Sequence, residues 1–150
     1  MFGVPSVRDT VFSGINIKFL GNGLFLLNGT STATVWGDVY MWYTWDTPLI
    51  VGHRYYVKMT PYFSIPEGGT ASSFRLVDSY SGRFGLSLTD TSLIFTNPSN
   101  NSNCYVSFRI DSGIALNNVT VHICMVDLNE TFGDNNNLTK EQCDEIFNMP

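Results

Sequence analysis

Apolar and polar residues alternate with a period of two along most of the chain up to Val126. This alternation is typical of β-strands with one buried face, because successive side chains of a strand point to opposite sides of a sheet. Turns rich in Gly, Asn and Pro separate the strands at intervals of about 8–12 residues, and no segment with a helical period lies between them. The pattern therefore predicts an all-β protein, a sandwich or a barrel, and argues against a parallel α/β sheet.

The clearest hairpin is predicted over residues 15–28. Its turn is Gly21-Asn22-Gly23, and Asn-Gly is a favoured hairpin pair because both positions tolerate a positive φ. In the last strand, Val119, Val121, Ile123 and Met125 share the face expected to be buried. The other strands are predicted at 33–45, 54–60, 73–78, 84–88, 93–95 and 105–110.

The acidic charge is confined to the end of the chain. Residues 127–150 hold six acidic residues and one lysine, which accounts for the whole net charge of −5. The 126 residues before them are neutral, so we expect no nucleic-acid binding, which needs a surplus of Lys and Arg. We divide the chain into a segment 1–13, a sandwich 14–126 and an acidic tail 127–150.

The tail carries the signals of a short helix. Thr139 and Gln142 form a capping box, and Leu138 and Cys143 are spaced for a hydrophobic staple. Cys143, Ile146 and Phe147 form an apolar stripe at i, i+3 and i+4. A helix of about two turns is marginal alone in water, so we expect it to dock on the sandwich through that stripe.

No motif in the sequence indicates catalysis or a cofactor. Three cysteines, Cys104, Cys124 and Cys143, fit no disulfide framework or metal motif, so we expect free buried thiols; a Cys104–Cys124 bridge is the alternative. His53 and His122 are expected to be structural. Residues 127–133 only partly match a calcium loop, because the glycine is one position late and the twelfth ligand is missing. We therefore expect no enzyme activity and no cofactor, with calcium in another loop left open.

The N-terminus has no basic run followed by an apolar core, so we expect no secretory signal. No apolar stretch approaches the roughly 18 residues that a membrane-spanning helix needs, so we expect no membrane insertion.

All three tryptophans lie between residues 36 and 45. In a regular strand, one face would carry an aromatic and acidic mixture: Trp36, Asp38, Tyr40, Trp42 and Asp46. Aromatic rings stack on the C–H faces of sugars, and carboxylates accept hydrogen bonds from their hydroxyls. We therefore predict a glycan platform on this face. The alternative is that these aromatics belong to the core or to an interface between subunits.

The tail has a recognisable pattern. Asp127, Leu128, Phe132, Gly133, Asn136, Thr139, Glu141 and Phe147 match the signature D-L-T-x-M-F-G-x-G-N-E-P-T-x-E-E-F-E-x-M-F. The chain departs from it at Thr131, Asn135, Asn137, Leu138 and Cys143. Together with segments 14–17, 21–23, 26–33 and 52–55, this resembles a β-sandwich module of bacteriophage tail and minor structural proteins.

The resemblance implies an antiparallel jelly-roll sandwich, like a carbohydrate-binding module, with one short C-terminal α-helix. It implies a non-enzymatic virion protein of a tail, fibre or other appendage. Its expected partners are other virion proteins, further copies of itself, with a trimer favoured, and a host-surface glycan. The alternative is a purely structural adaptor whose aromatic face is buried against neighbouring subunits. Segment 1–13 is expected to be an arm or anchor on the particle.

Overall fold

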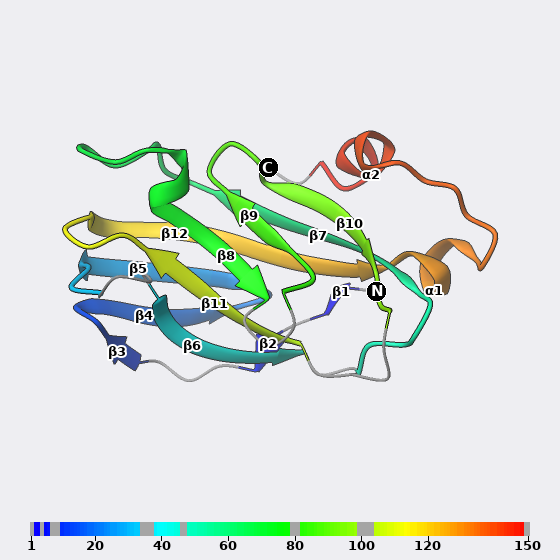
Figure 1. Ribbon diagram of the computed structural model, residues 1–150, viewed down its shortest axis with the longest axis horizontal. Helices are drawn as coiled ribbons and strands as arrows, with labels where there is room; N and C mark the ends of the chain where they lie inside the picture. Colours follow the sequence, from blue (N-terminus) through cyan, green and yellow to red (C-terminus); the bar gives the residue numbers. More distant parts are fainter. Residues whose placement is uncertain are drawn as a thin grey trace.

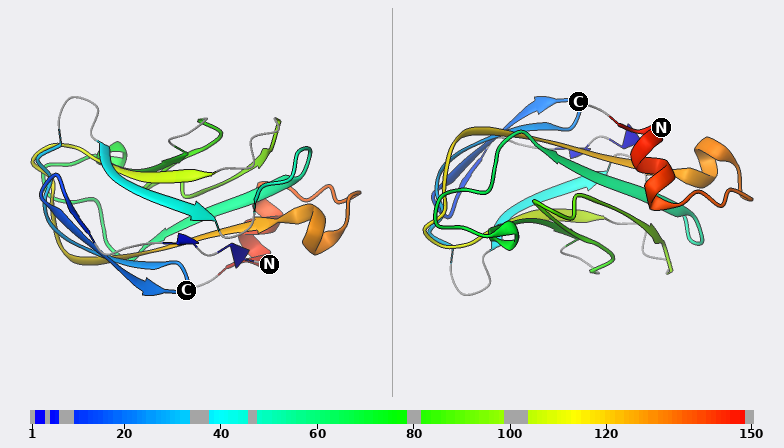
Figure 2. Two further views of the ribbon diagram at one scale, coloured as in Figure 1. Left: turned by 90° about the horizontal axis from the view of Figure 1, so that it is seen from below. Right: turned by 90° about the horizontal axis from the view of Figure 1, so that it is seen from above.

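The computed structural model describes residues 2–3, 5–6, 10–33, 38–45, 48–78, 82–98 and 104–148. They form two antiparallel sheets stacked as two layers, with a pair of helices at one end (Figure 1, Figure 2). In the seven-stranded sheet, six strands follow the order β10 (Ser92–Thr96), β7 (Arg54–Pro61), β12 (Ala115–Asp127), β5 (Leu24–Thr30), β4 (Ile15–Gly21), β3 (Thr10–Phe12). The seventh strand, β1 (Phe2–Gly3), pairs with β12. The five-stranded sheet has the order β2 (Pro5–Ser6), β6 (Asp38–Trp45), β11 (Tyr105–Ile110), β8 (Phe74–Asp78), β9 (Gly85–Ser87).

The expected all-β sandwich is confirmed. After β5 the chain passes repeatedly between the two sheets, so strands adjacent in a sheet are mostly distant in sequence. The core lies between the layers and is built from the inward positions of both, including Ile17, Phe25, Val57, Leu76 and Phe108, all of which are fully buried. Phe25 from one sheet meets Phe108 from the other edge to face, with ring centroids 5.9 Å apart.

The hairpin turn occurs where the sequence predicts it. Asn22 and Gly23 both have positive φ, 52° and 78°, between the paired Gly21 and Leu24. A Cβ atom on Gly23 would lie 2.2 Å from the carbonyl oxygen of Ile123. The close approach of β12 therefore requires glycine here as strictly as the turn does.

Strand β12 is longer than predicted because it contains a bulge. Its register with β5 shifts between Leu116 and Val119, and Asn118 in the shift has a φ of +48°. One extra residue changes which positions face the core. Leu116 before the bulge and Val121 after it are therefore both buried. The polar residues between them break the strict period of two, so the sequence did not predict that the strand begins before the bulge.

The described part of segment 1–13 is paired within the chain. β1 pairs with β12, β2 with β6, and β3 with β4. The role of this segment as an anchor, and the division of the chain at residues 13 and 126, stay predictions.

Two helices follow the last strand. α1 (Leu128–Phe132), which the sequence reading did not predict, begins at Asp127, whose carboxylate accepts a hydrogen bond from the backbone N–H of Glu130. α2 (Lys140–Ile146) has the predicted capping box of Thr139 and Gln142. Neither helix in the described part of the chain has the length and apolarity that crossing a bilayer requires.

α2 docks on the outer face of the seven-stranded sheet. Cys143 is fully buried, and Phe147 stacks on Tyr56 with ring centroids 5.5 Å apart. The predicted docking stripe is wrong at Ile146, which is 51% exposed. The helix ends there, so Phe147 reaches the sheet from the cap position while Ile146 turns to solvent.

Candidate functional site

β6 carries the predicted glycan platform. The structure describes the backbone of Asp38, Tyr40 and Trp42 in this strand, but their side chains lie outside the description. Trp36 and Asp46 lie outside the described residues altogether. The platform therefore stays a prediction. The strands on one side of β6, namely β11 and β8, carry the described side chains of the same sheet face.

The register of β6 with β11 shifts between Val106 and Phe108, and the pairs on either side of the shift keep the same facing. Val39 and Tyr43 pair with Phe108 and Val106, both fully buried, whereas Asp38 pairs with Arg109. Opposite residues of an antiparallel pair share one face of the sheet. The register is thus compatible with the predicted division of this strand into a core side and an outward side.

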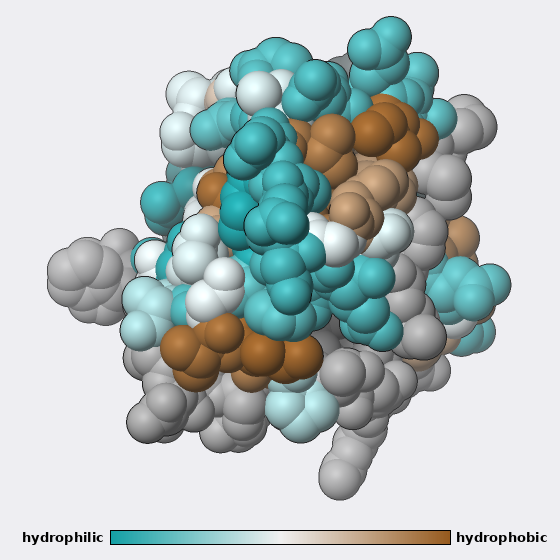
Figure 3. Space-filling model, turned by 90° about the vertical axis from the view of Figure 1, so that its right-hand side faces the viewer, coloured by the Kyte–Doolittle hydropathy of each residue, from teal (hydrophilic) through white to brown (hydrophobic). Residues whose placement is uncertain are grey.

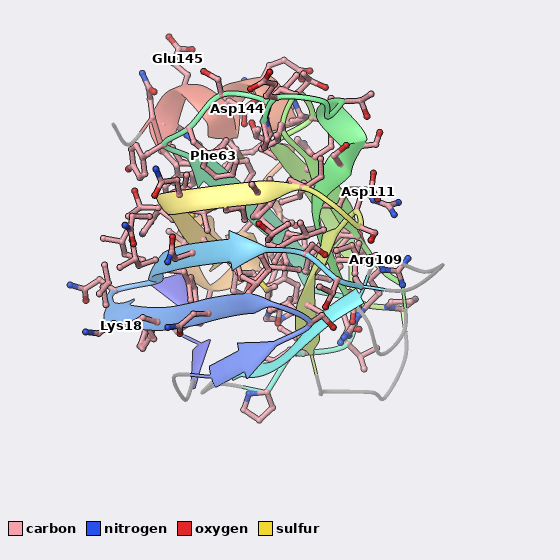
Figure 4. All side chains as sticks on the ribbon, turned by 90° about the vertical axis from the view of Figure 1, so that its left-hand side faces the viewer. Lys18, Phe63, Arg109, Asp111, Asp144 and Glu145 are labelled. Atoms are coloured by element: carbon pink, nitrogen blue, oxygen red, sulfur yellow. The ribbon has the colours of Figure 1, made fainter. Side chains whose placement is uncertain are left out.

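The outward face of the five-stranded sheet contains a row of polar residues. On β11, Val106, Phe108 and Ile110 belong to the core, so Ser107 and Arg109 point the other way. On β8, Phe74 and Leu76 are in the core, and Arg75 and Val77 point outward. The pairing aligns Asp38, Arg109, Arg75 and Ser87 across four neighbouring strands. Figure 4 shows Arg109 on this side of the molecule and Lys18 on the opposite side.

Three polar atoms of this face are buried without a hydrogen-bond partner among the described residues. They are the Nε of Arg75, the Oγ of Ser107 and the Nε of Arg109, although Arg109 interacts with other groups. A buried unsatisfied donor or acceptor costs roughly 1–3 kcal/mol. Arg75 as a whole is half-buried, so its guanidinium is held against the sheet rather than extended into solvent.

These residues were not found from the sequence. Arg75 and Ser107 lie at ordinary outward positions of two strands whose adjacency the sequence does not reveal. The only signal was the period of two, which correctly places them opposite the core residues.

The histidines have structural partners. His53 Nδ1 lies 2.8 Å from a carboxylate oxygen of Asp127, the residue that caps α1. His122 Nε2 lies 2.8 Å from the carbonyl oxygen of Asn22 in the hairpin turn. Within the part of the chain that is described, no group of three His, Cys, Asp or Glu side chains could hold a metal ion.

A second polar cluster holds the tail to the sandwich. Tyr56 and Ser92 donate hydrogen bonds of 2.7 and 2.5 Å to Oδ1 of Asp144, and Lys140 Nζ lies 3.2 Å from Oδ2. Burial by itself would raise the pKa of Asp144, but the hydrogen bonds from Ser92, Tyr56 and Lys140 outweigh it and lower that pKa. Burial, together with the hydrogen bond to Asp144, raises the pKa of Tyr56 well above 10.0.

Arg54 fastens the loop between the two helices. Its guanidinium donates to the side-chain oxygen of Asn136 at 2.9 Å and to the carbonyl oxygen of Leu138 at 2.6 Å.

Cys124 and Cys143 are buried free thiols, as is Cys104, so the prediction of free thiols is confirmed and no Cys104–Cys124 bridge forms. Burial raises the pKa of Cys124 to about 11, which makes this thiol a poor nucleophile. The polar groups around Asp144, together with Arg54, therefore hold the tail on the sandwich and have a structural role.

The fold and its outward face define the class as an antiparallel β-sandwich with a polar sheet face and a docked C-terminal helix. The chain is similar in fold to a chain of the "Glycosylation Associate Protein (Gap123) complex from Streptococcus agalactiae", with a TM-score of 0.50 and 16% sequence identity. The likeness covers 85% of this chain and 45% of that one, so this chain spans less than half of its structural neighbour. No protein-family model and no curated protein matches the sequence.

Proposed function

We propose that the chain is a non-enzymatic bacteriophage virion structural protein, part of a tail, fibre or other appendage, whose five-stranded sheet binds a host-surface glycan. The virion assignment is supported by the resemblance of the tail to the phage signature. The glycan assignment is supported by the outward face, where the half-buried Arg75 on β8 makes no hydrogen bond with any described residue and lies one strand away from the aromatic strand β6. Rings for stacking next to oriented polar groups are what a sugar site needs.

The proposal places the site on β6, β11 and β8. Trp42 and Tyr40 would stack on the sugar, and Asp38 would accept hydrogen bonds from its hydroxyls, with Trp36 and Asp46 extending the platform at either end of the strand. The protein would act as a homo-oligomer, with a trimer favoured, so that several weak sites engage one surface together.

A glycan array with the purified oligomer tests this function. We expect binding by the wild type and binding weakened about tenfold or more by Trp42→Ala, because stacking on a large aromatic ring is lost. The matched control is Tyr62→Ala, since Tyr62 is a 47% exposed aromatic residue outside this sheet. Wild-type protein that binds no glycan, or equal binding by Trp42→Ala, would contradict the proposal.

The second candidate is an assembly or adaptor subunit without a ligand. It is favoured by apolar side chains exposed at the end of the sandwich that carries the helices, where brown patches interrupt a mostly hydrophilic surface (Figure 3). Ile50 and Val51, in the loop after β6, are each 48% exposed, and Phe132 on α1 is 43% exposed. Under this alternative, the β6 aromatics are covered by a neighbouring subunit.

Intrinsic fluorescence separates the two candidates, because every tryptophan of the chain lies within residues 36–45. Acrylamide should quench the fluorescence of the assembled oligomer if β6 faces solvent, and an array-positive glycan should protect it. Fluorescence that acrylamide cannot reach in the assembly would favour the adaptor function.

A further inference from the structure

Two arginines face each other on the outward side of the five-stranded sheet. Arg109 of β11 pairs directly with Arg75 of β8. Directly opposite side chains in an antiparallel pair have Cβ atoms only about 5 Å apart, and like charges at such positions are destabilising. The arrangement therefore places two positive charges where the sheet alone does not favour them.

Only one acidic residue lies in the same row. Asp38 of β6 pairs with Arg109 on the side away from Arg75. Arg75 has Ser87 of β9 as its other neighbour, which carries no charge. The other outward residues described on β8, β9 and β11, namely Val77, Gly85 and Ser107, are uncharged. Asp38 is therefore the one acidic residue that the pairing places in this row, and β11 lies between its strand and that of Arg75.

Arg75 also makes no hydrogen bond or salt bridge with any described residue, and its Nε is buried. A guanidinium offers a planar fork of donors that matches a carboxylate with two parallel hydrogen bonds. Ser107, on the neighbouring strand, lies on the same face but is only 1% exposed, so its hydroxyl is not available to a ligand. A half-buried cation without a partner, one strand away from the aromatic strand β6, fits an anionic group attached to a ring.

We infer that the glycan bound by this sheet carries a carboxylate, as uronic and sialic acids do, and that Arg75 binds that carboxylate. The sugar ring lies toward β6. This inference rests on the proposed glycan-binding function and specifies the class of its ligand.

Calorimetric titration with matched acidic and neutral sugars tests the inference. The probes are an oligogalacturonic acid, an oligosialic acid and the carboxyl-reduced form of each. We expect at least one acidic oligomer to bind about tenfold or more tightly than its reduced form. The affinity for that acidic oligomer should also fall as sodium chloride is raised, whereas a neutral sugar should show little salt dependence.

The variant Arg75→Gln should remove the preference for the acidic form. Arg75→Lys should bind with intermediate affinity, because it keeps the charge and loses the planar fork. The matched control is Lys18→Gln, which removes one exposed positive charge from the other sheet and should bind as the wild type does (Figure 4). Circular dichroism verifies that each variant is folded, and if Arg75→Gln does not fold, the salt titration of the wild type decides.

The outcomes separate this inference from the function on which it rests. Binding of neutral glycans with no preference for a carboxylate, or a preference that survives in folded Arg75→Gln, overturns the inference and leaves the glycan function standing. Salt-independent binding of the acidic oligomers also overturns it. Failure of the wild type to bind any glycan overturns both.

Discussion

Arg83 and Asp78 form a buried ion pair at one end of the sandwich core. The Nε of Arg83 lies 2.7 Å from a carboxylate oxygen of Asp78, and the two side chains are 5% and 0% exposed. Arg83 also donates to the side-chain oxygen of Asn97 at 3.0 Å, and its guanidinium carbon lies 5.9 Å from the centre of the Phe95 ring. Arg83 thus joins the two sheets, because it contacts Asp78 at the end of β8 and Asn97 directly after β10.

Removing one member of this pair should be costly. Arg83→Met leaves the carboxylate of Asp78 buried without its cation, and we expect a loss of about 3–5 kcal/mol in the free energy of unfolding. The double variant Arg83→Met/Asp78→Asn should be the more stable of the two, because no buried charge is left uncompensated. Urea denaturation measures both. A single variant as stable as the wild type would show that water reaches the pair.

α2 illustrates how an element is specified locally and placed by distant contacts. Thr139 and Gln142 determine where it begins. Its position on the sheet depends on Tyr56, Ser92 and Arg54, which lie in strands or at strand ends far from the helix in sequence. Figure 4 shows Asp144 and Glu145 on this helix at the margin of the molecule.

Docking of α2 should weaken at low pH through Asp144. The pKa of Asp144 is lowered in the folded chain from its ordinary value of 3.8, so the folded state binds fewer protons than the unfolded state. Its contribution is therefore present above about pH 4 and is lost as pH falls through the lowered pKa. The carboxylate is 36% exposed, so we expect Asp144→Asn to cost only about 1 kcal/mol at pH 7, and less as the pH falls through the lowered pKa.

Urea unfolding followed by circular dichroism from pH 2 to 7 measures this effect. The control is Glu145→Gln, which removes the same charge from the same helix at an exposed position. A stability difference between wild type and Asp144→Asn that does not change with pH would contradict the role given to this carboxylate.

At the scale of the whole molecule, the described chain has two apolar clusters of unequal size. The larger fills the space between the sheets. The smaller consists of Tyr56, Val126, Leu128 and Cys143, with Ile94, Leu138 and Phe147 around it, and it holds the helices to the outer face of one sheet. β7 and β12 contribute residues to both clusters. The tail packs on the sandwich through the smaller cluster, whereas the larger cluster holds the two sheets together without the tail.

We therefore expect the tail to open without unfolding the sandwich. Hydrogen exchange followed by mass spectrometry should show weaker protection of the amides of α2 than of those of β12, because fewer buried contacts must break to expose them. Equal protection in both segments would mean that the tail and the sandwich form a single cooperative unit.

The strands and the capped helix could be predicted because their signals are local. Alternation, an Asn-Gly turn and a Thr-x-x-Gln box act within a few residues. The predictions failed where another element intervened. The bulge at Asn118 interrupts the period of β12. Ile146 has the spacing of a docking residue but is 51% exposed, and Phe147 packs on Tyr56 instead.

The candidate site was only partly accessible to prediction. The sequence predicted a glycan platform on the aromatic strand β6. The side chains of that platform lie outside the described residues, so it stays a prediction. The sequence could not identify Arg75 as a candidate binding residue. Arg75 lies opposite Arg109 of β11, and the chain reaches β11 only after it has crossed to the other sheet and back.

The sequence by itself determined the class of fold, the hairpin, the helix start and the neutrality of the body, because these follow from residues near one another along the chain. Only the tertiary structure decided that two arginines and a buried serine share one outward face, that Asp144 holds the tail on the sandwich, and that Arg83 links Asp78 of one sheet to Asn97 beside the other. Each depends on strand order and register, which are set by the packing of the whole core rather than by any one segment.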